Sequence, residues 1–116
     1  MPDESPPVPR ADVVLAINVI HIAPWEATQR LFSHAARMLG GGGFVYLYGP
    51  FRYRDRELEP SNQRFDAWLH GRAPHSGIRT FEEVDGVARD HGFTLVADEP
   101  MPANNRSIWW ERDPDR

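Results

Sequence analysis

The stretch that decides the fold is ADVVLAINVIHIAPW, residues 11–25. It begins with the unbroken apolar run VVLAI at residues 13–17 and then turns polar at Asn18 and His21. An apolar run without alternation is typical of a strand that is covered on both faces, as in the parallel sheets of α/β folds. We therefore expect a buried strand, then a polar loop, then a helix with Pro24 in its first turn.

Helices and strands alternate along the rest of the chain. Predicted strands cover residues 12–18, 44–48, 93–98 and 107–111, and predicted helices cover residues 24–39, 61–70 and 80–91. Strands that are joined through helices should be parallel, whereas the last strand, which follows a short turn at residues 100–105, should be antiparallel to its neighbour. The predicted fold class is therefore α/β.

Local signals set the predicted ends of the helices. Ser61 or Asn62 is expected to cap the second helix, and Thr80 opens a sequence with the form of a capping box. The four glycines at residues 40–43 close a helix and enter a strand, which is the reverse of a phosphate-binding loop. We interpret them as a helix stop and a tight turn, at the sheet edge opposite the predicted site.

The composition excludes several classes of function. The chain has 116 residues, of which 41% are hydrophobic, and a formal charge of -4, so no nucleic-acid partner is indicated. It has no Cys, and its histidines lack metal-ligand spacing, so neither a disulfide nor a metal site is expected. No apolar run approaches membrane-spanning length and the start lacks a signal-peptide pattern, so we expect a cytoplasmic protein and no membrane partner.

The predicted topology brings polar side chains from several loops to the carboxyl edge of the sheet, where α/β proteins bind ligands. The first loop supplies Asn18, His21 and Trp25, and the helix over residues 61–70 is expected to fold across the same edge as a lid. The other loops supply Tyr48, Gly49, Pro50, Met101, Pro102, Ala103, Asn104 and Asn105. Amides, an imidazole and aromatic rings in one place suit a polar, uncharged or zwitterionic small molecule.

Each candidate residue has a structural alternative. His21 is a candidate general base or substrate contact because histidine titrates near neutrality, and the alternative is a histidine hydrogen-bonded to a nearby loop. Asp66 is a candidate catalytic acid or base, and the alternative is a solvated carboxylate on an amphipathic helix. Asn104 and Asn105 either hold a ligand or satisfy the backbone of a turn.

Five strings of residues carry a resemblance that covers the chain from about residue 11 to residue 112. They are INVIHIAPWEAT (17–28), LYGPF (47–51), EPSNQRFDAWL (59–69), GIRTFEEV (77–84) and EPMPANNRS (99–107). Together they resemble an uncharacterised, domain-of-unknown-function family of methyltransferase-like proteins, of the class I S-adenosylmethionine-dependent fold.

That fold has seven strands in the order 3-2-1-4-5-7-6, and the strands of this chain resemble the fourth to the seventh, the last being antiparallel. The resemblance thus implies the C-terminal half of a Rossmann-like sheet, with three parallel strands and one antiparallel strand flanked by helices. The Gly-rich loop that cradles the cofactor's methionine belongs to the first half, and no such segment is found in these residues. We therefore expect a disordered, proline-rich lead-in at residues 1–10, a partial methyltransferase-like domain at residues 11–112 and a tail at residues 113–116.

The resemblance also implies positions for the residues that match the family's strings. Asn18, His21 and Trp25 stand on the loop after the fourth strand, which in this fold contacts S-adenosylmethionine and substrate, while His21 and Asp66 are the candidate catalytic residues because of their side-chain chemistry. The acceptor side is expected to be lined by Gly49, Pro50, Ser61, Asn62, Phe65, Asp66, Asn104 and Asn105. The reaction would be methyl transfer from a sulfonium to a nucleophile on a small molecule.

Two functions of different classes remain open at this point. The first is a methyltransferase-family protein that lacks its cofactor half and is inactive alone. The second is a non-catalytic binding or assembly module, in which the unpaired edge of the strand over residues 13–17 joins a second copy or a partner chain. A Rossmann-type oxidoreductase fragment is disfavoured, because the last strand is predicted to be antiparallel and no dinucleotide fingerprint is present.

Overall fold

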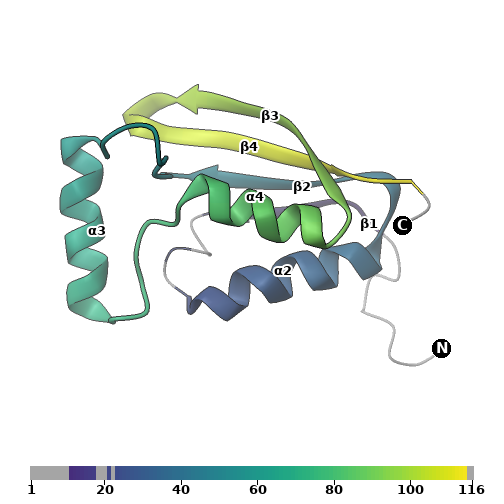
Figure 1. The fold of residues 1–116 in the computed structure, drawn as a ribbon, viewed down its shortest axis with the longest axis horizontal. Coiled ribbons are helices and arrows are strands. Elements are labelled where there is room, and N and C mark those ends of the chain that lie inside the picture. The colour runs from purple at the N-terminus through teal and green to yellow at the C-terminus, as the bar shows by residue number, and fades with distance from the viewer. Residues whose placement is uncertain (1–10, 18–20, 22, 115–116) are drawn as a thin grey trace.

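The computed structural model of the protein describes residues 11–17, 21 and 23–114. The predicted lead-in at residues 1–10 and the predicted site residue Asn18 lie outside the described residues. In chain order, the elements are β1 (Ala11–Ile17), α2 (Trp25–Met38), β2 (Leu39–Gly49), α3 (Pro60–Arg72), α4 (Phe81–Asp90), β3 (Phe93–Met101), the short 3-10 helix η1 (Pro102–Asn104) and β4 (Asn105–Arg112) (Figure 1). Every predicted helix and strand is present.

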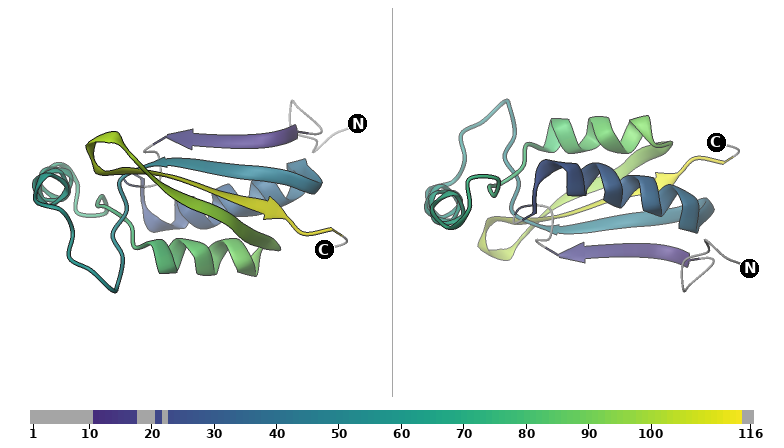
Figure 2. Two further views of the ribbon diagram at one scale, coloured as in Figure 1. Left: turned by 90° about the horizontal axis from the view of Figure 1, so that it is seen from above. Right: turned by 90° about the horizontal axis from the view of Figure 1, so that it is seen from below.

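The strands form one mixed sheet in the order β1-β2-β4-β3. β1 is parallel to β2, whereas β4 lies between β2 and β3 and is antiparallel to both. Because β2 and β3 both run against β4, the first three strands of the chain share one direction and the last is reversed. Figure 2 shows β1 and β3 at the two edges of this sheet. The predicted α/β class and the predicted strand directions are therefore confirmed.

The helices α2 and α4 pack side by side against one face of the sheet (Figures 1 and 2). Each helix has an apolar stripe at helical spacing, which is what drives a helix onto a sheet. The fully buried residues of this layer are Phe32 and Ala35 of α2, Val84 and Ala88 of α4, and Val45, Leu47, Phe93, Ile108 and Trp110 of the strands. The ring of Phe32 meets Phe93 and Trp110 edge to face, with centroids 5.6 and 5.4 Å apart, so aromatic contacts join α2 to β3 and β4.

The other face of the sheet carries exposed apolar side chains. Val13 and Leu15 of β1 are 54% and 59% exposed, while Val14 between them packs against the core. On the same outer face, the rings of Tyr46 and Trp109 stack with centroids 5.7 Å apart. The prediction that the first strand is covered on both faces is therefore wrong, because the described residues place helices over one face of the sheet only.

The glycine run at residues 40–43 comes after the end of α2 and lies within β2, not in a separate tight turn. α2 stops at Met38 and β2 begins at once with Leu39, so the glycines are part of the strand. Ala11 lies opposite Leu39 while Val13 lies opposite Phe44, so the glycines form an irregular bulge against β1. Gly42 has a φ of 88°, which glycine adopts without strain.

The helix starts differ from the predicted caps. The N-cap of α3 is Glu59, with Pro60 in the first turn, and not Ser61 or Asn62. Thr80 is the N-cap of α4, but its side chain makes no capping hydrogen bond. The helices of the described ranges are all too short or too polar to cross a membrane.

Candidate functional site

The carboxyl ends of β1 and β2 point toward α3, which lies across that end of the molecule (Figures 1 and 2). The loop after β1, the loop after β2 and the hairpin between β3 and β4 all reach the same end. This is the edge at which the sequence predicts the site, and α3 has the position expected for a lid.

His21 is almost fully buried, with 1% of its surface exposed, and it joins three loops. Its backbone carbonyl accepts a hydrogen bond from the N–H of Gly77 at 2.8 Å, and its Nδ1 accepts one from the N–H of Arg79 at 3.1 Å. The ring is also hydrogen-bonded to the backbone of Pro50 and Gly77, and it packs edge to face on Phe51 with centroids 5.1 Å apart. The loop after β1 is thereby fastened to the loop after β2 and to the segment before α4.

The environment of His21 keeps its imidazole neutral at physiological pH. Burial, and next the positive charge of Arg79, lower the pKa of His21 from 6.5 to about 4. Hydrogen bonds to the backbone of Gly77 and Pro50 and the charge of Asp66 oppose this shift only in part. A ring whose Nδ1 accepts a backbone N–H matches the alternative of a loop-binding histidine, and a catalytic role for His21 stays a prediction.

Arg79 covers the predicted cofactor residue Trp25. Its guanidinium donates hydrogen bonds to the carbonyls of Ala23 at 2.5 Å and His75 at 2.8 Å, and it lies over the Trp25 ring at 5.8 Å from the centroid. Burial lowers the pKa of Arg79 from its ordinary value, with nearby carboxylates opposing the shift. Sequence reasoning assigned no role to Arg79 or to Gly77, although both belong to the GIRTFEEV string.

Asp66 holds the segment between α3 and α4 against α3. Its Oδ1 accepts the N–H of Ile78 at 2.7 Å, and its Oδ2 lies 3.7 Å from Arg52 and 3.6 Å from His70. A Cβ on Gly77 would lie 2.8 Å from the His70 ring and 3.2 Å from Asp66, so only glycine fits there without movement. Asp66 is thus a mostly buried, hydrogen-bonded carboxylate rather than a solvated one, and its catalytic role stays a prediction.

The structure brings together three of the predicted acceptor residues. The buried amide of Asn62 donates to Oε1 of Glu59 at 3.0 Å and to the carbonyl of Asn104 at 3.1 Å. The Asn104 amide in turn donates to the hydroxyl of Ser61 at 3.1 Å. These bonds fasten the start of α3 to the hairpin between β3 and β4, where Ala103 and Asn104 both have positive φ.

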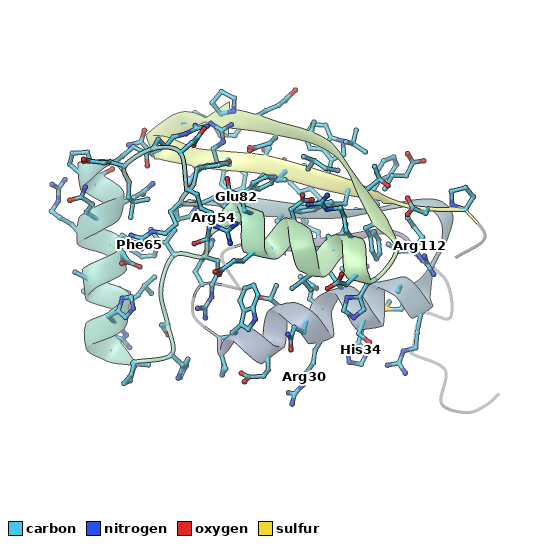
Figure 3. All side chains as sticks on the ribbon, viewed as in Figure 1. Arg30, His34, Arg54, Phe65, Glu82 and Arg112 are labelled. Atoms are coloured by element: carbon cyan, nitrogen blue, oxygen red, sulfur yellow. The ribbon has the colours of Figure 1, made fainter. Side chains whose placement is uncertain are left out.

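The remaining predicted acceptor residues serve their own segments. Asn105 donates its amide to the carbonyl of Pro102, which satisfies the turn. Gly49 is the last residue of β2, opposite Arg106, and it is buried together with Pro50. Phe65 points from α3 toward the loops (Figure 3), where it packs on a small buried cluster of Leu58, Leu69 and Ile78.

The loop after β2 is tied down on both sides. Figure 3 shows Arg54 beside Glu82, whose Oε1 accepts the Arg54 N–H at 3.2 Å. Tyr53 donates its hydroxyl to Oδ2 of Asp98 at 2.5 Å, and Arg106 donates to the other oxygen of Asp98 at 2.8 Å. Burial, and then the hydrogen bond to Asp98, raise the pKa of Tyr53 above its ordinary value.

Replacing Asn62 by alanine is expected to loosen α3 from the hairpin. The change leaves the Asn104 carbonyl and the Glu59 carboxylate without a donor, which should cost about 1–2 kcal/mol in the free energy of unfolding. Urea denaturation measures this loss. Arg64→Ala, at an exposed position of the same helix, is the control and should change stability by less than about 0.5 kcal/mol. Equal losses for the two variants would contradict the assignment of Asn62 as the anchor.

The predicted contacts with S-adenosylmethionine stay a prediction. Of the three predicted cofactor contacts, Asn18 lies outside the described residues, His21 has its ring engaged by backbone groups, and Trp25 lies beneath Arg79. Nor do the His, Asp and Glu side chains of the described ranges gather into a group that could hold a metal ion.

Known proteins share this fold. A family model described as "Protein of unknown function (DUF938)" matches residues 3–112. An O-methyltransferase family protein from Burkholderia thailandensis superposes with a TM-score of 0.76 at 19% identity, over 92% of this chain and 32% of its own. An O-methyltransferase family 2 protein from Planctomyces limnophilus, in complex with apigenin, superposes with a TM-score of 0.80 at 22% identity, over 92% of this chain and 32% of its own. Human N-acetylserotonin methyltransferase, in complex with SAM, superposes with a TM-score of 0.77 at 18% identity, over 93% of this chain and 31% of its own.

At these identities the likeness shows the fold, which is methyltransferase-like. The chain spans about a third of the length of these solved proteins, although almost all of it is superposed.

Proposed function

Because this chain belongs to the DUF938 family of proteins of unknown function and has a methyltransferase-like fold, we propose that it forms the acceptor side of an S-adenosylmethionine-dependent methyltransferase. The observation that carries this proposal is the strand order β1-β2-β4-β3 with β4 reversed. It corresponds to strands 4-5-7-6 of the class I methyltransferase sheet. On this proposal the chain corresponds to the C-terminal half of that domain.

Cofactor binding then needs polypeptide that lies beyond the described residues. In the class I sheet the neighbour of the fourth strand is the first strand, which carries the Gly-rich cofactor loop. Here the corresponding edge of β1 has no neighbour among the described residues. We infer that the described part of the chain is inactive alone and that the cofactor half docks against β1.

In a complete enzyme, S-adenosylmethionine supplies a methyl group made electrophilic by its sulfonium. The part of this chain is to hold the acceptor in line and to exclude water, since alignment supplies much of the rate in such displacements. α3 and the hairpin it binds lie at the carboxyl edge of the sheet, which is where this task requires them. Of the two predicted catalytic groups, the side chain of Asp66 is the more accessible, with 16% of its surface exposed, because His21 is almost fully enclosed.

A small-molecule acceptor is supported by the solved relatives. The Planctomyces protein was solved in complex with apigenin, and the human protein is an N-acetylserotonin methyltransferase. By analogy, we propose a small organic molecule as the acceptor of this chain.

Calorimetric titration with S-adenosylmethionine and S-adenosylhomocysteine tests the proposal. The 116-residue chain, checked for folding and size, should show no micromolar binding. Binding should appear when a strand, Gly-rich loop and helix of the class I type are joined ahead of β1. Micromolar binding by the chain alone would overturn the assignment to the acceptor side. If the fused protein is folded but does not bind S-adenosylmethionine, the methyltransferase interpretation is wrong.

A second function, assembly through β1, is favoured by the exposed side of this strand. β1 pairs only with β2 among the described strands, so its outer edge presents free backbone groups that invite another strand. On the uncovered face of the sheet next to this strand, Val13, Phe44, Tyr46 and Trp109 line an apolar hollow of about 230 Å³. We propose that a strand from a second copy of the chain, or from a partner chain, adds here.

Light scattering at high protein concentration measures this assembly. The wild-type chain should have a mass well above the 13.3 kDa of one chain. Leu15→Lys should shift it toward the monomer, because a charged side chain on an edge strand opposes pairing and Leu15 is exposed. Val96→Lys, on the exposed part of the opposite edge strand, is the matched control and should leave the mass unchanged. A monomeric wild type would contradict self-association.

A further inference from the structure

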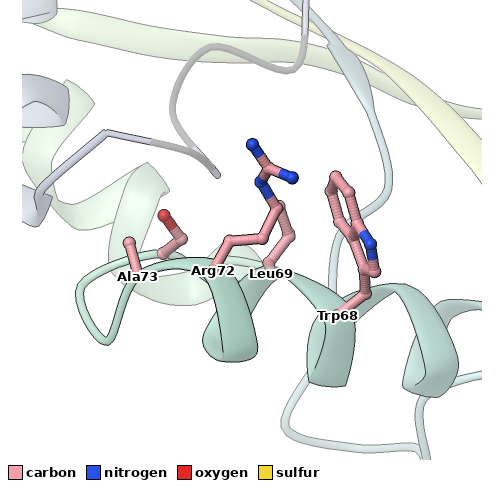
Figure 4. A pocket seen from close by; sticks show the side chains of 5 residues that line it. Trp68, Leu69, Arg72 and Ala73 are labelled. Carbon is pink, nitrogen blue, oxygen red and sulfur yellow. The ribbon is translucent and has the colours of Figure 1, made fainter.

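A cleft of about 540 Å³ lies along α3, at the end of the sheet that holds the predicted site (Figure 4). Its lining residues are Trp68, Leu69, Arg72, Ala73 and Ser76. Figure 4 shows Trp68, Leu69 and Arg72 projecting from the same side of the helix. The volume is within the range of small-molecule sites, roughly 300–1,000 Å³.

Trp68 and Arg72 form a paired aromatic and cationic surface in this cleft. They are one helical turn apart, and the guanidinium carbon of Arg72 lies 4.9 Å from the centroid of the Trp68 ring. Phe65 stacks beside Trp68 with centroids 6.1 Å apart, so the indole is held in place although it is 55% exposed. Within the described part of the chain, Arg72 forms no ion pair with a carboxylate.

The other walls of the cleft are apolar with a hydroxyl at one end. Leu69 is buried and belongs to the small cluster with Leu58 and Ile78, so it gives the cleft a fixed apolar floor. Ser76 is buried where the segment after α3 turns back, and its N–H donates to the carbonyl of Ala73 at 3.0 Å. A flat ring can therefore lie on fixed apolar groups while its polar substituent reaches a cation.

We propose that this cleft binds a small planar aromatic carboxylate. The ring lies against Trp68 and Leu69, and the carboxylate accepts two parallel hydrogen bonds from the guanidinium of Arg72, the geometry in which arginine recognises carboxylates. The single cation and the neighbouring aromatic surface select a compact aromatic acid over a polyanion or an aliphatic chain. That this acid is also the methyl acceptor rests on the proposed function, whereas the binding itself does not.

The test uses 4-hydroxybenzoate and its uncharged counterpart 4-hydroxybenzamide, titrated into the full chain without S-adenosylmethionine. NMR of the indole N–H groups follows the four tryptophans, and the Trp68 signal is identified by its loss in Trp68→Phe. The acid should shift the Trp68 signal in a saturable way, and the amide should bind at least about tenfold more weakly. The signal of buried Trp110 reports on the fold of every variant.

Arg72→Gln should weaken binding of the acid by about the same tenfold and abolish the difference between acid and amide. Arg64→Gln, on an exposed part of the same helix outside the cleft, should leave the affinity unchanged. Three results would each overturn the proposal. They are the absence of a saturable Trp68 shift at millimolar acid, equal affinities for acid and amide, and an Arg72→Gln variant that binds the acid as tightly as the wild type. Because no cofactor is present, these outcomes are separate from the calorimetric test of methyl transfer.

Discussion

Trp110→Ala is expected to destabilise the protein by about 3–5 kcal/mol, which is enough to unfold much of a small domain. Trp110 is fully buried at the centre of the core, where its ring meets Phe32 edge to face and stacks near Phe81. It therefore joins β4 to both α2 and α4. Its indole N–H also donates to Oδ1 of Asp85 at 2.9 Å, so truncation leaves a cavity and an unpaired carboxylate oxygen.

Two further variants separate these contributions. Trp110→Phe keeps a six-membered ring, loses the donor to Asp85 and leaves a smaller cavity, so its cost should exceed the roughly 1–2 kcal/mol of the lost hydrogen bond and stay below that of Trp110→Ala. Trp109→Ala removes an equally large side chain from the outer face, where its ring stacks on Tyr46, and should cost less than half as much as Trp110→Ala. Urea denaturation followed by circular dichroism gives all three values. A Trp109→Ala loss as large as that of Trp110→Ala would mean that the outer face is covered in solution.

The second large effect is a loss of stability in acid that is caused by His21. Its pKa is 6.5 in an ordinary environment and about 4 in the fold, so the unfolded chain binds more protons than the folded one between these values. The stabilisation is therefore fully present above pH 6.5, falls as the pH falls, and is lost near pH 4. The difference between the two pKa values corresponds to roughly 3 kcal/mol.

The contribution of His21 is isolated by comparing the wild type with His21→Gln across this range of pH. Glutamine still donates and accepts hydrogen bonds but does not titrate, so the difference between the two proteins isolates the proton uptake of His21. The variant should be less stable than the wild type at neutral pH, and the difference should shrink toward pH 4. His34→Gln, on the exposed face of α2 (Figure 3), should keep the pH dependence of the wild type. A wild-type advantage over His21→Gln that stays constant with pH would contradict this mechanism.

The topology could be predicted because it depends on local patterns. Short apolar runs, the helices between them and the turn-rich PMPANN segment determine which strands are parallel, and the resemblance supplied the position of β4 between β2 and β3. Helix ends were less predictable because competing signals lie side by side. Proline at residue 60 starts α3 one residue before Ser61, and the glycines at residues 40–43 form an irregular bulge inside β2.

The exposure of β1 could not be predicted from its own residues. Val13 and Leu15 have the composition of a strand buried on both faces, but burial depends on what covers the strand, and here helices cover one face. The partners of the site residues were equally hidden. The bond from Asn62 to Asn104 spans 42 residues, and that from Arg79 to His21 spans 58. Sequence patterns identified the polar residues, while only the fold shows that they bind each other.

The position of β1 at the edge of the sheet has a consequence for hydrogen exchange. A strand with one neighbour directs every second backbone N–H to its partner and the others outward. The amide protons of Ala11–Ile17 should therefore alternate between slow and fast exchange with deuterium, with a period of two residues. When another strand joins this edge, the fast set becomes slow, so the exchange pattern of these few amides reports directly whether β1 has found its second neighbour.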